Sequence, residues 1–136
     1  MRLDPDTARD RFASARVARL ATVSVDRQPH LVPFTFVVVD DLIVHAVDHK
    51  PKSSTNLRRL RNIADNPQVS ALADEYSDDW TRLWWARADG DAEIWHDNRA
   101  DMLDLLAAKY HQYQEVRPTG PIVAIRVTRW TGWSAS

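Results

Sequence analysis

The sequence predicts a single β-rich α+β domain built on an antiparallel sheet or small barrel. The chain has 136 residues, of which 44% are hydrophobic and 27% are charged, a balance typical of one globular domain. Most of its apolar segments are short and β-prone, and several adjoin through brief polar turns, as hairpins do. Helical segments interrupt these strands without the regular alternation that a doubly wound parallel sheet requires.

The first half of the chain predicts a short helix followed by three strands. Asp4 can cap the helix and Pro5 suits its first position, so the helix should end near Arg16. Pro33 lacks the N–H that a sheet ladder needs, which predicts an edge or a bulge in the second strand. The three segments expected to form a meander are residues 17–25, 29–39 and 42–48.

The second half predicts two helices and three further strands. A helix over residues 53–66 should begin with Ser53, Ser54 or Thr55 as its cap and end before Pro67. Its apolar face would carry Leu57, Leu60, Ile63 and Ala64. Strands are expected over residues 68–76, 81–95 and 121–133, with Gly90 as a bend or bulge, and a helix over residues 98–114.

Composition limits the classes of function. The chain contains no cysteine, which excludes disulfides, thiolate metal ligands and a thiol nucleophile. Its formal net charge of -1 argues against a surface that binds nucleic acid as a whole. The N-terminus is charged from its second residue, and no apolar run approaches membrane-spanning length, so a cytoplasmic protein without membrane contact is expected.

The stretch "HAVDHKPKSSTNLRRLRN", residues 45–62, predicts an anion site at the start of a helix. A helix N-terminus presents free N–H groups and the positive end of its dipole, which suit a phosphate or carboxylate. Lys50 and Lys52 precede the helix, and hydroxyl and amide donors follow from Ser53 and Asn56. The alternative interpretation is a solvated basic turn. Arg58, Arg59 and Arg61 are assigned to the outer face of the helix.

Other candidate sites receive less support. His45 and His49 are four residues apart, but this segment reads as strand and turn and no third ligand is evident, so no metal site is expected. His30 either lines a pocket or is structural. The segment "LWWAR" places Trp84 and Trp85 on opposite faces of a strand, so that one enters the core and the other meets a partner subunit or a flat ligand.

The order of elements resembles that of the pyridoxamine 5′-phosphate oxidase-like (PPOX class) split β-barrel oxidoreductases. It is most similar to small actinobacterial members described as dependent on coenzyme F420. The resemblance covers nearly the whole chain and rests on the combination of strand, "KPK", helix and "NP" strand. The segments that carry it are "RVARLATVSVDRQPHLVPFTF", "LIVHAVDHKPKSSTNLRRLRNIADNPQVSAL" and "DDWTRLWWARADGDAEI".

The resemblance implies that residues 1–136 form one six-stranded antiparallel split β-barrel with flanking helices. It further implies a homodimer that holds flavin or deazaflavin in grooves at the subunit interface. Lys50 stands where some relatives carry arginine, and lysine lacks the bidentate fork of arginine. The residues that match the phosphate-binding segment are Lys50, Lys52, Ser53 and Asn56, and those that match the wall facing the ring are Leu31, Val32, Pro33, Phe34, His45, Ala46 and Val47.

The expected activity is transfer of a hydride from reduced coenzyme F420 to a small, planar, unsaturated substrate. The cofactor carries the reactive carbon, which accounts for the lack of a recognisable catalytic triad or acid pair. The catalytic side chain is left unassigned, because the completing proton can come from solvent, His45 or His30. Three alternatives stay open: an FMN-binding oxidase or flavin reductase, a non-catalytic module that binds the cofactor or haem, and a nucleic-acid module that uses the arginine-rich helix.

Overall fold

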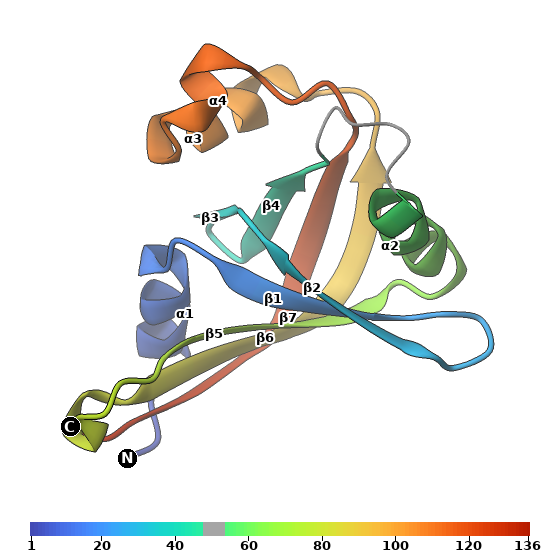
Figure 1. Ribbon diagram of the computed structural model, residues 1–136. Helices are drawn as coiled ribbons and strands as arrows, with labels where there is room; N and C mark the ends of the chain where they lie inside the picture. The colour runs from blue at the N-terminus through green and yellow to red at the C-terminus, as the bar shows by residue number, and fades with distance from the viewer. Residues whose placement is uncertain (48–53) are drawn as a thin grey trace.

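The computed structural model of the protein describes residues 1–47 and 54–136. The described residues form one antiparallel sheet with helices at its ends and along one side (Figure 1). In chain order the elements are α1 (Pro5–Ser14), β1 (Ala18–Val23), β2 (Pro29–Phe34), β3 (Val37–Val39), β4 (Leu42–Ala46), α2 (Ser54–Asp65), β5 (Gln68–Glu75), the 3-10 turn η1 (Trp80–Arg82), β6 (Trp84–Trp95), α3 (Ala100–Lys109), α4 (Gln112–Glu115) and β7 (Ile122–Ser134).

The sheet corrects the expectation of a six-stranded barrel. Its described part has seven strands in the order β2-β1-β5-β6-β7-β4-β3, and the ladder is not closed. The additional strand arises because the expected strand over residues 29–39 breaks at Thr35 and Phe36. Phe36 is fully buried, and its N–H bonds to the Tyr110 hydroxyl, 3.1 Å away, instead of a neighbouring strand.

This break divides the expected meander between the two edges of the sheet. β1 pairs with β2 as predicted, but β4 pairs with β3 and β7. β2 is an edge strand, which confirms the interpretation of Pro33. The three Cα-to-Cα steps from Phe34 to Val37 span at most about 11 Å. The sheet therefore curls until its two edge strands come together at this link.

The two longest strands, β6 and β7, pair along their whole length and join the two parts of the sheet. The register shifts between Asp89 and Gly90, which confirms the predicted irregularity at the glycine. A Cβ at Gly90 would overlap the carbonyl oxygen of Arg126, so the close approach of the two backbones requires glycine here. A bulge at this point bends the strand and increases its twist.

The core lies inside the curl of the sheet and under α3. Phe12 of α1, Leu20 of β1 and Phe36 belong to the larger apolar cluster. A smaller cluster joins Leu106 of α3 to β4 and β7. Trp84 is buried in the larger cluster, while Trp85, its neighbour along β6, points to the opposite face and is half-buried. This confirms that the two tryptophans face opposite sides.

The helices follow the sequence signals with one correction. Asp4 caps α1 by accepting a hydrogen bond from the Thr7 N–H over 2.8 Å, as its position predicted. The expected helix over residues 98–114 is broken into α3 and α4, because Tyr110 leaves helical geometry to bury its ring. Its hydroxyl lies 2.9 Å from the carbonyl oxygen of Arg16. Among the described helices, none is long and apolar enough to cross a membrane.

Candidate functional site

A groove of about 340 Å³ opens where the two edges of the sheet meet α2 and α4. We call it the edge groove. Its wall comes from segments far apart in the sequence, which the curl of the sheet brings together. Among the residues that line it are Pro33 and Phe34 of β2, Thr35 of the link, His45 and Ala46 of β4, Arg59 of α2 and Tyr113 of α4.

His45 and Arg59 form a buried polar pair in this groove, and each side chain is 5% exposed. The His45 Nδ1 atom lies 2.8 Å from the backbone carbonyl oxygen of Thr35. A carbonyl oxygen only accepts hydrogen bonds, so Nδ1 carries the proton and donates it. The Nε2 atom is left as an acceptor, and Arg59 donates to it from Nη1. The hydrogen bonds therefore select one neutral tautomer of the imidazole.

The surroundings of this pair favour a neutral histidine and a buried cation. Burial first, and then the positive charge of Arg59, lower the pKa of His45 to about 3. Burial also lowers the pKa of Arg59, although a guanidinium stays protonated in proteins. The Arg59 Nε–H is buried and has no hydrogen-bond partner among the described residues. An unpaired buried donor of this kind is costly, and an oxyanion is the ligand that suits it.

The structure brings together four of the residues predicted to face the ring: Pro33, Phe34, His45 and Ala46. The Phe34 ring meets the His45 ring edge to face, with centroids 5.4 Å apart.

The other predicted residues do not line this groove within the described part of the chain. Leu31 is exposed, while Val32 and Val47 belong to the apolar core. Lys50, Lys52 and Ser53 lie outside the described residues. Asn56 is in α2, and its side chain lies outside the described part.

Arg59 is the site residue that sequence analysis assigned wrongly. It was placed on the outer face of the helix together with Arg58 and Arg61, which are indeed exposed. The buried face of α2 instead carries Arg59, Asn62 and Ile63, while Ala64 is exposed. The signal was present, because Arg59 lies four residues before Ile63 and so shares its face. An apolar pattern alone does not show a polar residue on the buried face.

A polar layer continues from Arg59 beneath α2. Asn62 donates from Nδ2 to the Thr22 hydroxyl over 3.0 Å, and both side chains are buried. The Nδ1 atom of His30, on β2, is buried and unpaired among the described residues. Burial and the nearby charges of Arg58 and Arg59 lower the pKa of His30. His30 thus lies beside the cationic region of α2, although it does not line the groove.

A second cavity, of about 320 Å³, adjoins the edge groove. The two share Val17, Thr35 and Tyr113 as lining residues, so they form one continuous depression. At their border the hydroxyls of Thr35 and Tyr113 are 2.7 Å apart. Neither Thr35 nor Tyr113 was singled out from the sequence, because a lone hydroxyl in an apolar strand or helix carries no distinguishing pattern.

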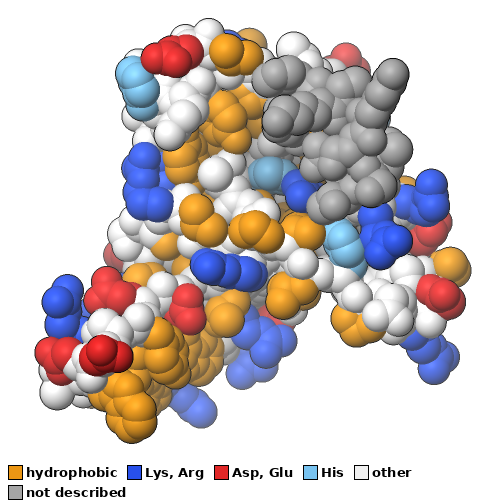
Figure 2. Space-filling view, in the orientation of Figure 1, with side chains coloured by type: hydrophobic (Ala, Val, Ile, Leu, Met, Phe, Trp, Pro, Cys, Tyr) orange, Lys and Arg blue, Asp and Glu red, His pale blue; other side chains and the backbone are white. Residues whose placement is uncertain are grey.

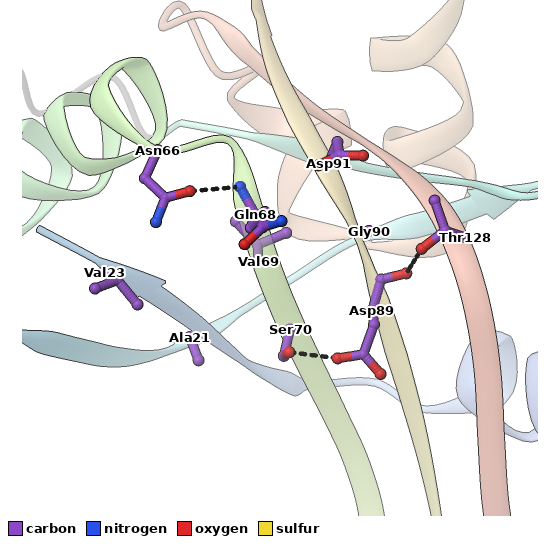
Figure 3. A pocket seen from close by; sticks show the side chains of 10 residues that line it. All are labelled: Ala21, Val23, Asn66, Gln68, Val69, Ser70, Asp89, Gly90, Asp91 and Thr128. Carbon is purple, nitrogen blue, oxygen red and sulfur yellow. Dashed lines mark hydrogen bonds between the residues drawn. The ribbon is translucent and has the colours of Figure 1, made fainter. Parts of the chain in front are cut away.

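Another hollow, of about 370 Å³, lies on the side of the sheet away from the core, where β1, β5, β6 and β7 are adjacent (Figure 3). Ser70 donates to an Asp89 carboxylate oxygen over 2.6 Å, and the Thr128 hydroxyl donates to the Asp89 backbone oxygen over 3.1 Å. None of its lining residues has a buried, unpaired side-chain atom in the described structure. These polar groups are satisfied within the protein, and the hollow offers no orphaned donor of the kind found in the edge groove.

The same side of the sheet, which we call the open face, exposes large apolar side chains. Cross-strand register places Leu31 and Ala21 in one row, and Leu72 and Arg87 in the next. Leu31, Leu72 and Trp133 are 69%, 39% and 38% exposed. Hydrophobic side chains also gather at the end of the arm formed by β5, β6 and β7 (Figure 2), where Trp80 is exposed.

Comparison with known proteins identifies the fold. A family model described as pyridoxamine 5′-phosphate oxidase matches residues 5–134. A solved FAD-binding protein from Mesorhizobium loti is 19% identical, with a TM-score of 0.75, over 97% of this chain and 95% of its own. A conserved hypothetical protein from Mycobacterium tuberculosis is 25% identical, with a TM-score of 0.73, over 98% and 86% of the two chains.

A haem storage protein from Vibrio cholerae, HutZ, shares the fold as well. It is 18% identical, with a TM-score of 0.64, over 95% of this chain and 91% of its own. No curated protein matches the sequence.

Proposed function

The chain belongs to the pyridoxamine 5′-phosphate oxidase family, and we propose that it is an oxidoreductase that uses reduced coenzyme F420. The proposed substrate is a small, planar, unsaturated molecule. When bound, the deazaflavin supplies the hydride, so the protein needs to hold the cofactor and place the substrate beside it. The observation that carries the proposal is the buried guanidinium of Arg59, whose Nε–H lacks a partner among the described residues.

The residues of the edge groove fit a cofactor that has a flat ring at one end and a phosphate at the other. Arg59 supplies a charge-assisted donor for the phosphate, worth about 1.5–3 kcal/mol for each hydrogen bond. Lys50, Lys52, Ser53 and Asn56 are proposed to complete the phosphate site. Apolar and aromatic surface from Pro33, Phe34 and Ala46 is suited to support the ring and to exclude water.

We further propose that the protein acts as a homodimer through the open face. This face exposes Leu72 and Trp133 next to charges of both signs, among them Arg87 and Asp89. A twofold interface places the same patch on both subunits, so a patch that mixes apolar groups with both charge signs is suited to pair with a copy of itself. Tryptophans of the second copy would then be available to cover the cofactor.

Two other occupants of the groove are alternatives. FMN carries the same ribityl phosphate, and solved proteins of this fold include one described as FAD-binding. Haem is the other, because HutZ, which shares the fold, is described as a haem storage protein. A haem carrier would hold its ligand without turning over a substrate.

The deciding experiment is a titration of the purified protein with coenzyme F420, FMN and haem side by side, followed by absorption and fluorescence. We expect saturable binding of coenzyme F420, and reoxidation of its reduced form by some members of a panel of planar enones and quinones. Tight binding of FMN or haem with no uptake of coenzyme F420 would overturn the proposal that coenzyme F420 is the cofactor.

A further inference from the structure

We infer that His45 is a positioning residue, a permanently neutral hydrogen-bond acceptor that aims Arg59 at the anionic group of the cofactor. The inference rests on the proposed function for the identity of that anion. It also removes His45 from the candidate proton donors, because both of its ring nitrogens are already engaged.

The first step is the orientation of the imidazole. The Nδ1 atom of His45 donates to the Thr35 carbonyl oxygen, 2.8 Å away. The Phe34 ring packs against the imidazole with an angle of 87° between the two ring planes. These contacts leave Nε2 as a lone-pair acceptor pointing at α2. A protonated imidazole would present a hydrogen there and repel the guanidinium.

The second step is the orientation of the guanidinium. Among the described residues, the hydrogen bonds of Arg59 involve Nη1 alone, which is bonded to His45. Arginine presents its donors as a planar fork, so fixing Nη1 also fixes the direction of the edge that carries Nε and Nη2. That edge has the geometry for bidentate contact with a phosphate or carboxylate, and its Nε–H is the buried donor without a partner.

The third step concerns charge. The titratable groups that line the groove are His45, Arg59 and Tyr113, and no described residue of the lining is a carboxylate. A carboxylate in place of His45 would also orient Arg59, but it would neutralise the charge and compete with the ligand. A neutral acceptor orients the guanidinium and leaves its full positive charge available to the anion.

The test uses two pairs of probes, in each of which only one member carries the phosphate. FMN is compared with riboflavin, and coenzyme F420 with its phosphate-free deazaflavin core, on wild type, His45→Leu and His45→Gln. We expect His45→Leu to weaken binding of the phosphate-bearing probes by about tenfold or more, with little change for the phosphate-free probes. His45→Gln, which retains an acceptor, should recover most of the loss.

Matched controls are His111→Leu and His111→Gln, because His111 is an exposed histidine on the connection between α3 and α4. They should leave all four affinities unchanged. Equal weakening of phosphate-bearing and phosphate-free probes by His45→Leu would make His45 part of the ring wall and overturn the inference. So would unchanged affinity for all four probes.

A second measurement uses the wild-type protein, so it does not depend on whether a variant folds. Nitrogen-15 NMR of the apo protein should show His45 with its proton on Nδ1 and no titration between pH 5 and 8, a range chosen to span the ordinary pKa of histidine, about 6.5. A proton on Nε2, or titration within that range, contradicts the inference. If wild type shows this tautomer but binds none of the four probes, the proposed function fails and the His45–Arg59 arrangement stands.

Discussion

Arg59 donates a hydrogen bond from Nη1 to the Nε2 atom of His45, so a buried cation is paired with a neutral imidazole ring. The bond joins α2 to β4 across the edge groove. A buried charge normally needs an ionic partner, and removing water from it costs several kcal/mol. Within the described residues of the groove lining, no carboxylate offsets this cost. The arrangement favours an anionic ligand at the expense of the stability of the empty protein.

Replacing Arg59 with methionine should separate these two effects. We expect affinity for FMN and coenzyme F420 to fall by about 10- to 100-fold, because a charge-assisted contact is lost. Thermal stability of the apo protein should be unchanged or higher, because methionine fills the site without a buried charge. Arg58→Met is the matched control, since Arg58 is the exposed neighbour in the same helix. A cofactor affinity equal to wild type in Arg59→Met contradicts the proposed anion site.

Replacing Lys50 and Lys52 together with alanine tests the remainder of the phosphate site. We expect the dissociation constant for coenzyme F420 to rise, because two cations proposed to contact the phosphate are removed. The melting temperature of the apo protein should stay nearly constant. Fluorescence titration and differential scanning calorimetry measure the two quantities. An unchanged dissociation constant would remove both lysines from the site.

The buried His45 predicts a pH dependence of stability. Its pKa is about 3 in the folded protein against an ordinary value of 6.5. Between these values the unfolded chain binds a proton that the folded protein excludes. The free energy of unfolding should therefore be fully retained above pH 6.5 and fall as the pH is lowered toward 3, by at most about 1.4 kcal/mol per pH unit.

Urea denaturation of wild type and His45→Gln across this range isolates the effect from that of the carboxylates. The variant should lose stability less steeply on acidification. Parallel curves for the two proteins would show that His45 titrates equally in both states.

Gly90 predicts a localised loss of stability on substitution. A Cβ at this position overlaps the carbonyl oxygen of Arg126, so Gly90→Ala must shift one of the two long strands. We expect a decrease of about 1–3 kcal/mol in the free energy of unfolding, as for overpacking in a core. Asp91→Ala, at the adjacent exposed position, is the control. Equal denaturation midpoints for Gly90→Ala and wild type would show that the strands adjust with no loss of stability.

The proposed dimer depends on the open face of the sheet. Leu72→Glu and Trp133→Glu should produce monomers in analytical ultracentrifugation, because each places a charge in the proposed apolar contact. Val25→Glu is the matched control, since Val25 is 81% exposed and lies outside the strands at the turn between β1 and β2. A wild-type protein that sediments as a monomer at micromolar concentration contradicts the proposal.

Local signals in the sequence determined most of the secondary structure. Asp4 and Pro5 located the start of α1, and Gly90 marked the irregularity in β6. Pro33 correctly indicated an edge strand, because the missing N–H is a property of the residue itself. These features depend on the backbone chemistry of one or two residues, so no knowledge of the rest of the fold was needed.

The tertiary structure alone decided where the chain changes edge and which partner the buried charge of Arg59 meets. The segment over residues 29–39 is continuously β-prone, and it divides because Phe36 enters the core and bonds to Tyr110, 74 residues away. The spacing of Arg59 to Ile63 is visible in the sequence, but the acceptor that His45 offers to Arg59 from another strand is not. Pairing between distant segments is a property of the folded chain, whereas caps, turns and strand propensity are local and can be predicted from the sequence.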